Sequence, residues 1–265
     1  MFEKTGILGN KIDIVLAIIR VGIFFGDKLF VKRTIDRAKA LVDSGGDWDR
    51  RNRLKAYQGL HLITIRSHNL AAPLLLDSLS TFTSYELCNY SSLAVYSVLA
   101  GSVSLKRVDF KAKVVDAPEI KAILGSGEEK LSALTGAASA GPGAGDEEMK
   151  DISTATPTPA PTAVNLTTLG SSSNGPAELE APIDFSPLAN LVSSLYIGDY
   201  RSFFLALAAV EENFLSQDRY LYEHRGWFVR EMRLRGYQQL LQSYRVVGLG
   251  SMANDFGVSV DYLDR

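Results

Sequence analysis

Apolar residues recur every three or four positions through most of this chain, and this helical period limits the folds open to it. The longest such run is predicted to form one helix from Tyr220 to about Val247. A helix of this length gains most of its stability from packing, so its apolar face needs partners. No alternating strand pattern occurs before residue 190, so the period predicts an all-α protein. The predicted apolar face of the long helix consists of Val229, Met232, Gly236, Leu240, Tyr244 and Val247.

The first 124 residues are predicted to form consecutive amphipathic helices joined by short turns. Asn10 and Asp47 are suited to capping two of them, because short polar side chains accept hydrogen bonds from the free N–H groups of a first turn. Gly59 and Ala71 fall where a tetratricopeptide-type (TPR) repeat brings two antiparallel helices close together. Residues 9–124 are therefore predicted to be TPR-like helical repeats stacked in a right-handed solenoid. The predicted helices span residues 10–25, 28–42, 50–65, 70–81, 89–105 and 109–124, the last kinked or split at Pro118.

Helical pattern returns after residue 185. Pro187 occupies a favourable first position of a helix reaching about Tyr196, and Asp199 is placed to cap the next helix, which runs to about Leu215. The long helix follows.

A helix–turn–helix is predicted to close the chain. Its first helix is expected to be capped by Ser251 and to end at Phe256, and Gly257 supplies the turn. Ser259 is placed to cap the second helix. This arrangement on a helical stack is the plan of a winged helix.

Residues 125–182 differ in composition from both flanks. They hold six of the nine prolines and no aromatic residue. Such a segment cannot bury enough apolar surface to offset the entropy lost on ordering. The sequence therefore predicts a disordered insertion over residues 125–185, and a phosphorylated or docking segment is the alternative interpretation.

Charge and cysteine content restrict the binding partners and the cellular compartment that we expect for the chain. The net charge of −2 gives no attraction to nucleic acid or anionic lipid, and the single cysteine, Cys88, excludes an internal disulfide. The apolar run Ile12–Phe25 is shorter than a membrane span of about 20 residues, and Asp13 and Arg20 interrupt it. We therefore expect a soluble intracellular protein in which this run is a helix buried between neighbours.

Residue types that carry chemistry do not gather in the sequence. The three histidines, His61, His68 and His224, have no cysteine or carboxylate that would complete a metal site. Glu211 and Glu212 are adjacent, so on a helix they point about 100° apart and do not converge on one substrate atom. No phosphate-binding, dinucleotide-binding or nucleophile-elbow motif occurs. The sequence predicts no enzyme activity, no metal and no cofactor.

Several separate blocks of sequence, in one order along the chain, resemble a known family. They resemble the PCI-domain family, which is shared by the proteasome lid, the signalosome and an initiation-factor complex, and they are most similar to a non-ATPase subunit of the lid. The blocks are residues 45–55, 57–60, 80–87, 229–233, 237–245 and 252–258.

The resemblance implies a structural scaffold subunit of the proteasome 19S regulatory particle lid, which supports ubiquitin-dependent degradation through protein contacts in cytoplasm and nucleus. Its partners would be other lid PCI subunits and regulatory-particle subunits. Residues 186–265 would form a PCI domain with an incomplete winged helix. Because family members extend further at both ends, the resemblance also implies a truncated subunit. The interface residues expected at the winged helix are Ser251, Asp255, Phe256, Val258, Val260 and Leu263.

Two other interpretations stay open. The first subunit of the COP9 signalosome shares this architecture, although blocks 45–48 and 80–87 favour the proteasome. A helix–turn–helix also suggests nucleic-acid binding, which needs Lys and Arg near phosphates. The second predicted helix instead carries Asp261 and Asp264, with only Arg265 beside them, and this argues against nucleic acid.

Overall fold

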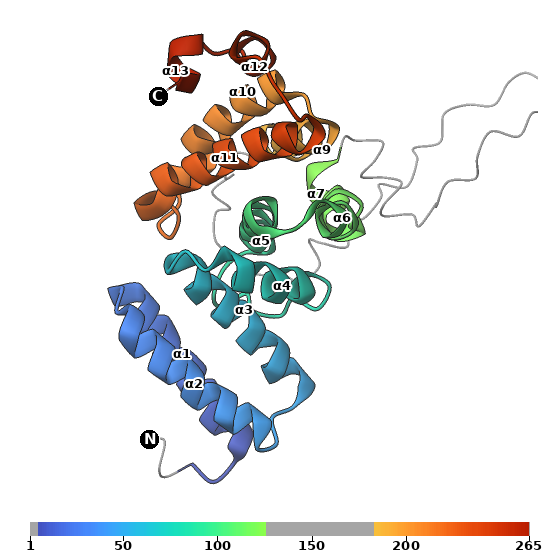
Figure 1. The fold of residues 1–265 in the computed structure, drawn as a ribbon. Helices are drawn as coiled ribbons and strands as arrows, with labels where there is room; N and C mark the ends of the chain where they lie inside the picture. The colour runs from blue at the N-terminus through green and yellow to red at the C-terminus, as the bar shows by residue number, and fades with distance from the viewer. Residues whose placement is uncertain (1–4, 126–182, 265) are drawn as a thin grey trace, which may run out of the picture. The chain divides into compact units, whose positions relative to one another are not determined.

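The computed structural model describes residues 5–125 and 183–264, and within these ranges the chain is helical and has no strand (Figure 1). This confirms the all-α prediction. The predicted insertion lies outside the described residues except at its two ends. The helices are α1 (Leu8–Phe25), α2 (Lys28–Asp43), α3 (Trp48–Thr64), α4 (His68–Leu79), α5 (Tyr90–Ser104), α6 (Arg107–Phe110), α7 (Pro118–Leu124), α9 (Ser186–Ile197), α10 (Tyr200–Val210), α11 (Arg225–Ser243), α12 (Leu249–Phe256) and α13 (Val260–Asp264). Two π-helical turns, Lys111–Val115 and Glu211–Leu215, continue α6 and α10, and a 3₁₀ turn, Tyr222–His224, precedes α11.

Local signals placed most helix starts correctly. The carboxylates of Asp47 and Asp199 accept hydrogen bonds from the backbone N–H groups of Arg50 (3.1 Å) and Ser202 (3.2 Å), as a helix N-cap does. The predicted cap at Asn10 is wrong, because α1 already begins at Leu8.

Neighbouring helices pack as pairs, with α1 on α2, α3 on α4 and α4 on α5. Gly59 permits the α3–α4 approach: a Cβ atom built on it would lie 2.4 Å from Cδ2 of Leu75, too close for any other residue type without movement. The small residue that the sequence singled out therefore lies at a close helix–helix contact. The split predicted at Pro118 is present, since this proline opens α7.

The long C-terminal helix is shorter at both ends than predicted. At its start, the carboxylate of Asp218 accepts hydrogen bonds from the N–H groups of Tyr220 (2.7 Å) and Leu221 (3.0 Å), which holds a turn before α11. At its end, Tyr244 is extended, with φ −128° and ψ 140°, and its side chain is exposed. Tyr244 was expected on the buried face, whereas Val229, Met232 and Leu240 on that face are buried.

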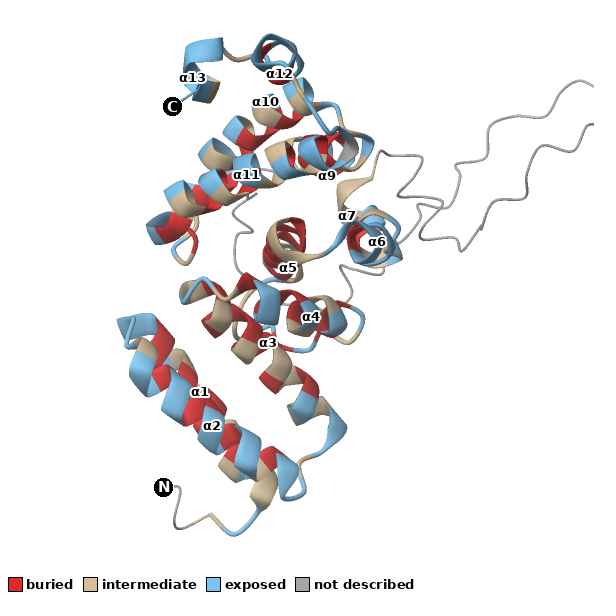
Figure 2. Cartoon of the chain, in the orientation of Figure 1, coloured by how far each residue is buried: buried red, intermediate tan, exposed pale blue. Residues whose placement is uncertain are grey.

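Figure 2 marks the buried residues in red, and two clusters of buried hydrophobic residues can be distinguished by their contacts. The main core is continuous from α1 to α11 and includes Tyr57, Phe110, Phe203 and Phe228. A second, much smaller group joins α12 to α10 and α11, and its buried members are Leu240, Met252 and Phe256.

Candidate protein-interaction surfaces

Phe256, one of the expected interface residues, is the anchor of the second core. Its ring lies 4.7 Å from the rings of Tyr200 and Tyr237 and 5.0 Å from that of Phe204, measured between centroids. It is only 2% exposed. Phe256 therefore fixes α12 on α10 and α11, and its burial leaves almost none of its side chain at the surface.

The other expected interface residues lie around this anchor. Ser251 and Asp255 are exposed on α12, and Val260 is exposed at the start of α13. Val258 and Leu263 are partly buried against the second core. The structure thus gathers the six residues at one end of the chain, and their role as an interface stays a prediction.

Capping at this end differs in one respect from the prediction. Ser251 is not the cap of α12, because the helix starts two residues earlier and Gly248 occupies its N-cap position. Ser259 does cap α13, since its Oγ accepts a hydrogen bond from the N–H of Tyr262 (3.3 Å). Arg233 Nη1 donates to the hydroxyl of Tyr262 (2.8 Å), which ties α13 to α11.

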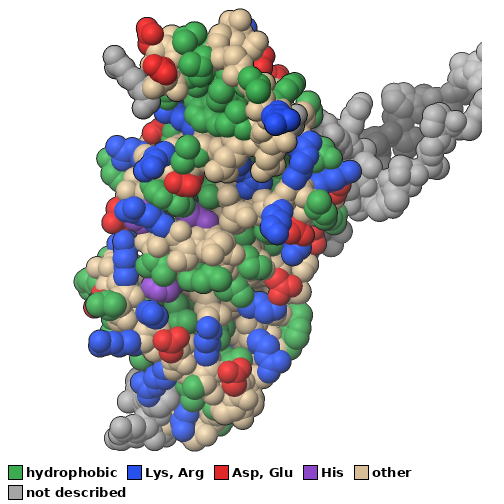
Figure 3. Space-filling view, in the orientation of Figure 1, with side chains coloured by type: hydrophobic (Ala, Val, Ile, Leu, Met, Phe, Trp, Pro, Cys, Tyr) green, Lys and Arg blue, Asp and Glu red, His purple; other side chains and the backbone are tan. Residues whose placement is uncertain are grey.

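The charge that α12 and α13 themselves carry is negative, although Arg201 and Arg233 of neighbouring helices lie close to this end. Residues 246–264 contain three aspartates, Asp255, Asp261 and Asp264, and no Lys or Arg. All three aspartates are exposed, and Figure 3 shows Asp and Glu side chains at the surface of this end of the molecule. Carboxylates repel phosphates, so the three aspartates of α12 and α13 disfavour contact with the backbone of a nucleic acid.

The α1–α2 turn carries an exposed apolar surface that the sequence analysis missed. The prediction that the run Ile12–Phe25 is buried between neighbours is wrong for one side of the helix. Residues such as Ile12 and Ile19 are buried, whereas Val21, Phe24 and Phe25 are more than half exposed. Helical period alone could not reveal this, because both sides of α1 are apolar.

Polar contacts join the first helices to α11. His224 is buried, its Nε2 donates a hydrogen bond to the carbonyl of Thr64 (2.8 Å), and its Nδ1 accepts one from Nε of Arg66 (3.0 Å). Arg66 has a left-handed backbone, with φ +63°, at the end of α3. The N–H of Arg66 bonds the carbonyl of Ile63 and the N–H of Ser67 bonds that of Leu62, the pattern of a Schellman motif in which glycine is usual.

The other two histidines are also packing residues. His68 stacks on Trp227 with ring centroids 5.1 Å apart. Burial, reinforced by the nearby His224, lowers the pKa of His68 to about 4, so its ring is neutral at physiological pH. Burial likewise lowers the pKa of His61. All three histidines are therefore buried within the fold rather than presented at its surface.

Two further contacts fix α11 and the turn before it against α5. The hydroxyl of Tyr96 donates to the carboxylate of Asp218 (2.5 Å). Arg235 donates to the carbonyl of Leu105, next to the C-terminal end of α5, where a cation is favoured by the helix dipole. Burial lowers the pKa of Arg235 to about 10, which still leaves it charged at neutral pH.

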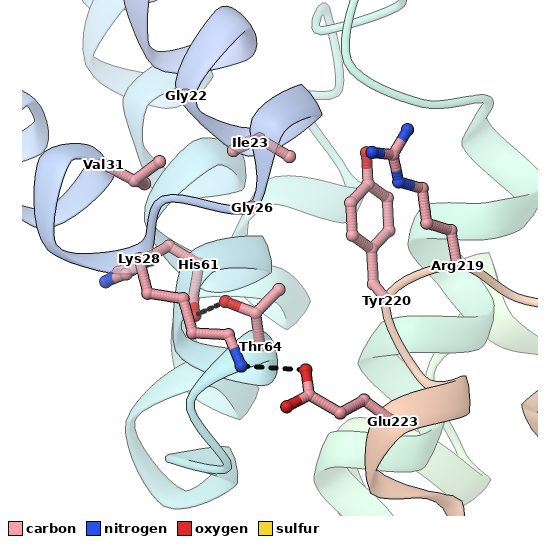
Figure 4. Close-up of a pocket in the computed structure, with 10 residues that line it drawn as sticks. All are labelled: Gly22, Ile23, Gly26, Lys28, Val31, His61, Thr64, Arg219, Tyr220 and Glu223. Carbon is pink, nitrogen blue, oxygen red and sulfur yellow. Dashed lines mark hydrogen bonds and ion pairs between the residues drawn. The ribbon is translucent and has the colours of Figure 1, made fainter.

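A small cavity lies beside these contacts, between the α1–α2 turn and the segment before α11 (Figure 4). Its volume is about 110 Å³, well below the roughly 300 Å³ at which ligand pockets begin. Lys28 Nζ and a carboxylate oxygen of Glu223 form an ion pair across it at 2.9 Å. The ion pair connects the α1–α2 turn to the segment before α11 and does not present reactive groups to a substrate.

Groups able to perform chemistry are dispersed in the part of the chain that the structure describes. No set of three His, Cys, Asp or Glu side chains there is placed to hold a metal ion. Burial raises the pKa of the Cys88 thiol to about 12, so it is not a nucleophile at neutral pH. In the same described ranges, no helix combines the length and apolarity needed to cross a membrane.

Comparison with known proteins gives two family matches. Residues 1–113 match the family described as 26S proteasome subunit RPN7, and residues 200–265 match the PCI domain. The first range covers α1 to α6, and the second begins at α10 and includes the anchor Phe256.

Whole-chain similarity points the same way. The chain is 39% identical over 264 residues to the 26S proteasome regulatory subunit rpn7 of Schizosaccharomyces pombe, covering 100% of this chain and 53% of that protein. It is 37% identical over 257 residues to subunit RPN7 of Saccharomyces cerevisiae, with coverage of 97% and 47%. It is 35% identical over 264 residues to 26S proteasome non-ATPase regulatory subunit 6 of Dictyostelium discoideum, with coverage of 100% and 54%. The chain thus spans about half the length of these relatives, and it belongs to the RPN7 family of PCI-domain proteins.

Proposed function

We propose that this chain is a structural scaffold subunit of the lid of the proteasome 19S regulatory particle. The observation that carries the proposal is its similarity, along its whole length, to proteins named as regulatory subunits of the 26S proteasome. The dispersed chemistry of the described residues and the exposed surfaces at α1–α2 and α12–α13 support a role in protein contacts rather than catalysis.

The finer parts of the proposal follow from the resemblance. Residues 9–124 act as TPR-like repeats, and residues 186–265 act as the PCI domain, with α12 and α13 as the helix–turn–helix of a winged helix. The surface around Ser251, Asp255, Val258, Val260 and Leu263 faces neighbouring PCI subunits, with Phe256 holding it in place. The protein works in cytoplasm and nucleus, without a cofactor and without nucleic acid.

Affinity purification from cells that express the tagged chain from its own gene tests the proposal. Mass spectrometry is expected to identify other lid subunits among the recovered proteins. Val260→Asp, at an exposed position of the proposed interface, should reduce their recovery, whereas Leu205→Asp, at an exposed apolar position of α10, should not. Recovery of signalosome subunits would select the alternative complex, and recovery of neither set would refute a scaffold role in the lid.

Nucleic-acid binding is the competing function from a different class. It predicts retention of labelled RNA or DNA that falls steeply as salt rises. The exposed aspartates of α12 and α13 favour the opposite result, and a filter-binding titration between low and physiological salt decides the matter.

A further inference from the structure

Two kinds of contact hold the α1–α2 pair to the other described helices. The first is apolar packing, because α1 and α2 pack on each other and on α3, and their inward side chains belong to the main core. The second lies at the α1–α2 turn, where the contacts with the segment before α11 join residues 195 positions apart. The two kinds of contact differ in strength and in what weakens them.

The contacts at the turn are polar and lie at the surface. Lys28 Nζ and the carboxylate of Glu223 form an ion pair at 2.9 Å, and these side chains are 39% and 65% exposed. The guanidinium of Arg219, an exposed residue, donates a hydrogen bond to the carbonyl of Phe24 and lies 5.0 Å from the centroid of the Phe24 ring. We call these two contacts the latch.

The latch has little apolar packing behind it. The cavity of about 110 Å³ is lined at this place by Ile23 of α1 and Tyr220 of the segment before α11, which lie on opposite sides in Figure 4. Its lining also includes the polar side chains of Thr64, Lys28 and Glu223. One water molecule needs roughly 10–15 Å³ of such volume and two to four polar partners, so the cavity suits several waters. Separation of the two walls would therefore remove less apolar contact than in a packed joint.

The latch is weak compared with the packing on α3. An exposed ion pair changes an equilibrium by at most about fivefold, and at about 1 M salt charges are screened beyond about 3 Å. Nε2 of His224 also lies 3.8 Å from the carboxylate of Glu223, but it already donates to the carbonyl of Thr64. By contrast, Val31 and Ile35 of α2 are buried in the main core. The turn can therefore separate from the segment before α11 while the α1–α2 pair stays packed on α3.

We propose that the latch opens and closes in the folded protein, so that the α1–α2 turn moves relative to the start of α11 while α3 supports it. Ionic strength sets the balance between the two forms, because salt weakens the Lys28–Glu223 pair and leaves the apolar packing on α3 in place. The inference rests on this joint alone and does not depend on assembly into the lid.

Thiol labelling measures the opening. Val31 is buried and lines the cavity, so the thiol of Val31→Cys reacts only when the cavity opens. Ile23→Cys, which lines the same cavity, gives an independent measurement. Ser97→Cys, at a buried position of α5, is the control site that reports opening of the main core. All three are made in the full chain with Cys88→Ser, checked for folding by circular dichroism, and labelled with an uncharged disulfide reagent.

Salt should act on the cavity sites alone. Raising sodium chloride from about 50 mM to about 1 M should accelerate labelling at Val31→Cys by about two- to fivefold and leave labelling at Ser97→Cys unchanged. Equal acceleration at both sites would show that the core opens as one unit, and no acceleration at Val31→Cys would show that the ion pair does not control opening. Either result overturns the proposal.

Variants without the charges assign the effect to the ion pair. Lys28→Gln and Glu223→Gln should each accelerate labelling at Val31→Cys at low salt by about two- to fivefold and remove most of its salt dependence. Their combination should be no faster than either alone, because each removes the same pair. The matched control Lys39→Gln, at an exposed lysine of α2 away from the latch, should keep the parent rate and its salt dependence. Additive acceleration in the combined variant would show that the two side chains act separately and would overturn the proposal.

Discussion

Phe228 and Phe256 are buried to the same degree, each 2% exposed, but they belong to different cores. Phe228 lies in the main core, which is continuous from α1 to α11, whereas Phe256 lies in a group with only two other buried members, Leu240 and Met252. Stability within one protein varies with the number of buried contacts that an element shares. The burial of a single side chain therefore does not tell how much of the structure depends on it, and the two phenylalanines form a matched pair for testing this.

Phe228→Ala should produce the largest effect. Removing a buried aromatic side chain from a main core costs about 3–5 kcal/mol in the free energy of unfolding. Urea unfolding followed by circular dichroism measures that loss over all helices at once. A loss below about 1 kcal/mol would show that the main core is less cooperative than its continuity indicates.

Acidification should destabilise the main core through His68. The pKa of His68 falls from the ordinary 6.5 to about 4 in the folded protein, so the unfolded chain binds the proton more readily between these values. Stability is fully present above about pH 6.5 and is lost as pH falls, by about 2 kcal/mol at pH 5 and about 3 kcal/mol at pH 4. Unfolding titrations at pH 7, 5 and 4 measure the loss.

His68→Phe serves as the control for that titration. It removes the titrating ring but keeps an aromatic side chain against Trp227, so the loss between pH 7 and pH 5 should be smaller than in the parent by about 2 kcal/mol. Carboxylates titrate in both proteins and cancel in the difference. Identical pH dependence in the two proteins would mean that His68 is not buried in neutral form.

Phe256→Ala should act on α12 and α13 alone. We expect the free energy of local opening to fall by about 2 kcal/mol. This is below the value for a main-core phenylalanine, because few neighbours must be rearranged. Hydrogen exchange read by mass spectrometry should accelerate in residues 249–264 and stay unchanged in α1–α5. Uniform acceleration across the chain would show that the two cores unfold as one.

Gly257→Ala should have the smallest effect, at the same end. Gly257 has φ +67°, where an alanine costs about 1 kcal/mol, and its added Cβ would lie 3.0 Å from Nε of Arg201. Hydrogen exchange of α12 and α13 should rise modestly. Gly248→Ala is the control, since Gly248 has φ −75° and no atom within 4 Å of an added Cβ, and it should leave exchange unchanged.

Features set by neighbouring residues were predictable from the sequence. The caps at Asp47 and Asp199 depend only on a carboxylate three residues before an N–H group, and the end of α12 depends only on glycine at position 257. The caps proposed at Asn10 and Ser251 failed because each helix begins earlier, with Ile7 or Gly248 at its N-cap position and no side-chain cap.

Features that join distant segments could not be predicted in this way. The burial of Phe256 requires rings from α10 and α11, and the contact between Arg66 and His224 spans 158 residues. The exposed side of α1 could not be predicted for a related reason. An apolar residue indicates that burial is favourable, but it does not indicate whether another segment of the chain packs against it. The candidate interface stays a prediction, and within it the sequence did not distinguish Phe256, which is buried, from Val260, which is exposed.

The position of Arg66 makes one residue serve two structural purposes. One residue sets the corner after α3 through its left-handed backbone and holds His224, at the start of α11, through its guanidinium. The orientation of the Arg66 side chain, and with it the hydrogen bond to His224, therefore depends on the left-handed backbone at that corner. Glycine would relax the backbone there but would leave Nδ1 of His224 without its donor, so that His224 would be tied to this corner only by its bond to the carbonyl of Thr64.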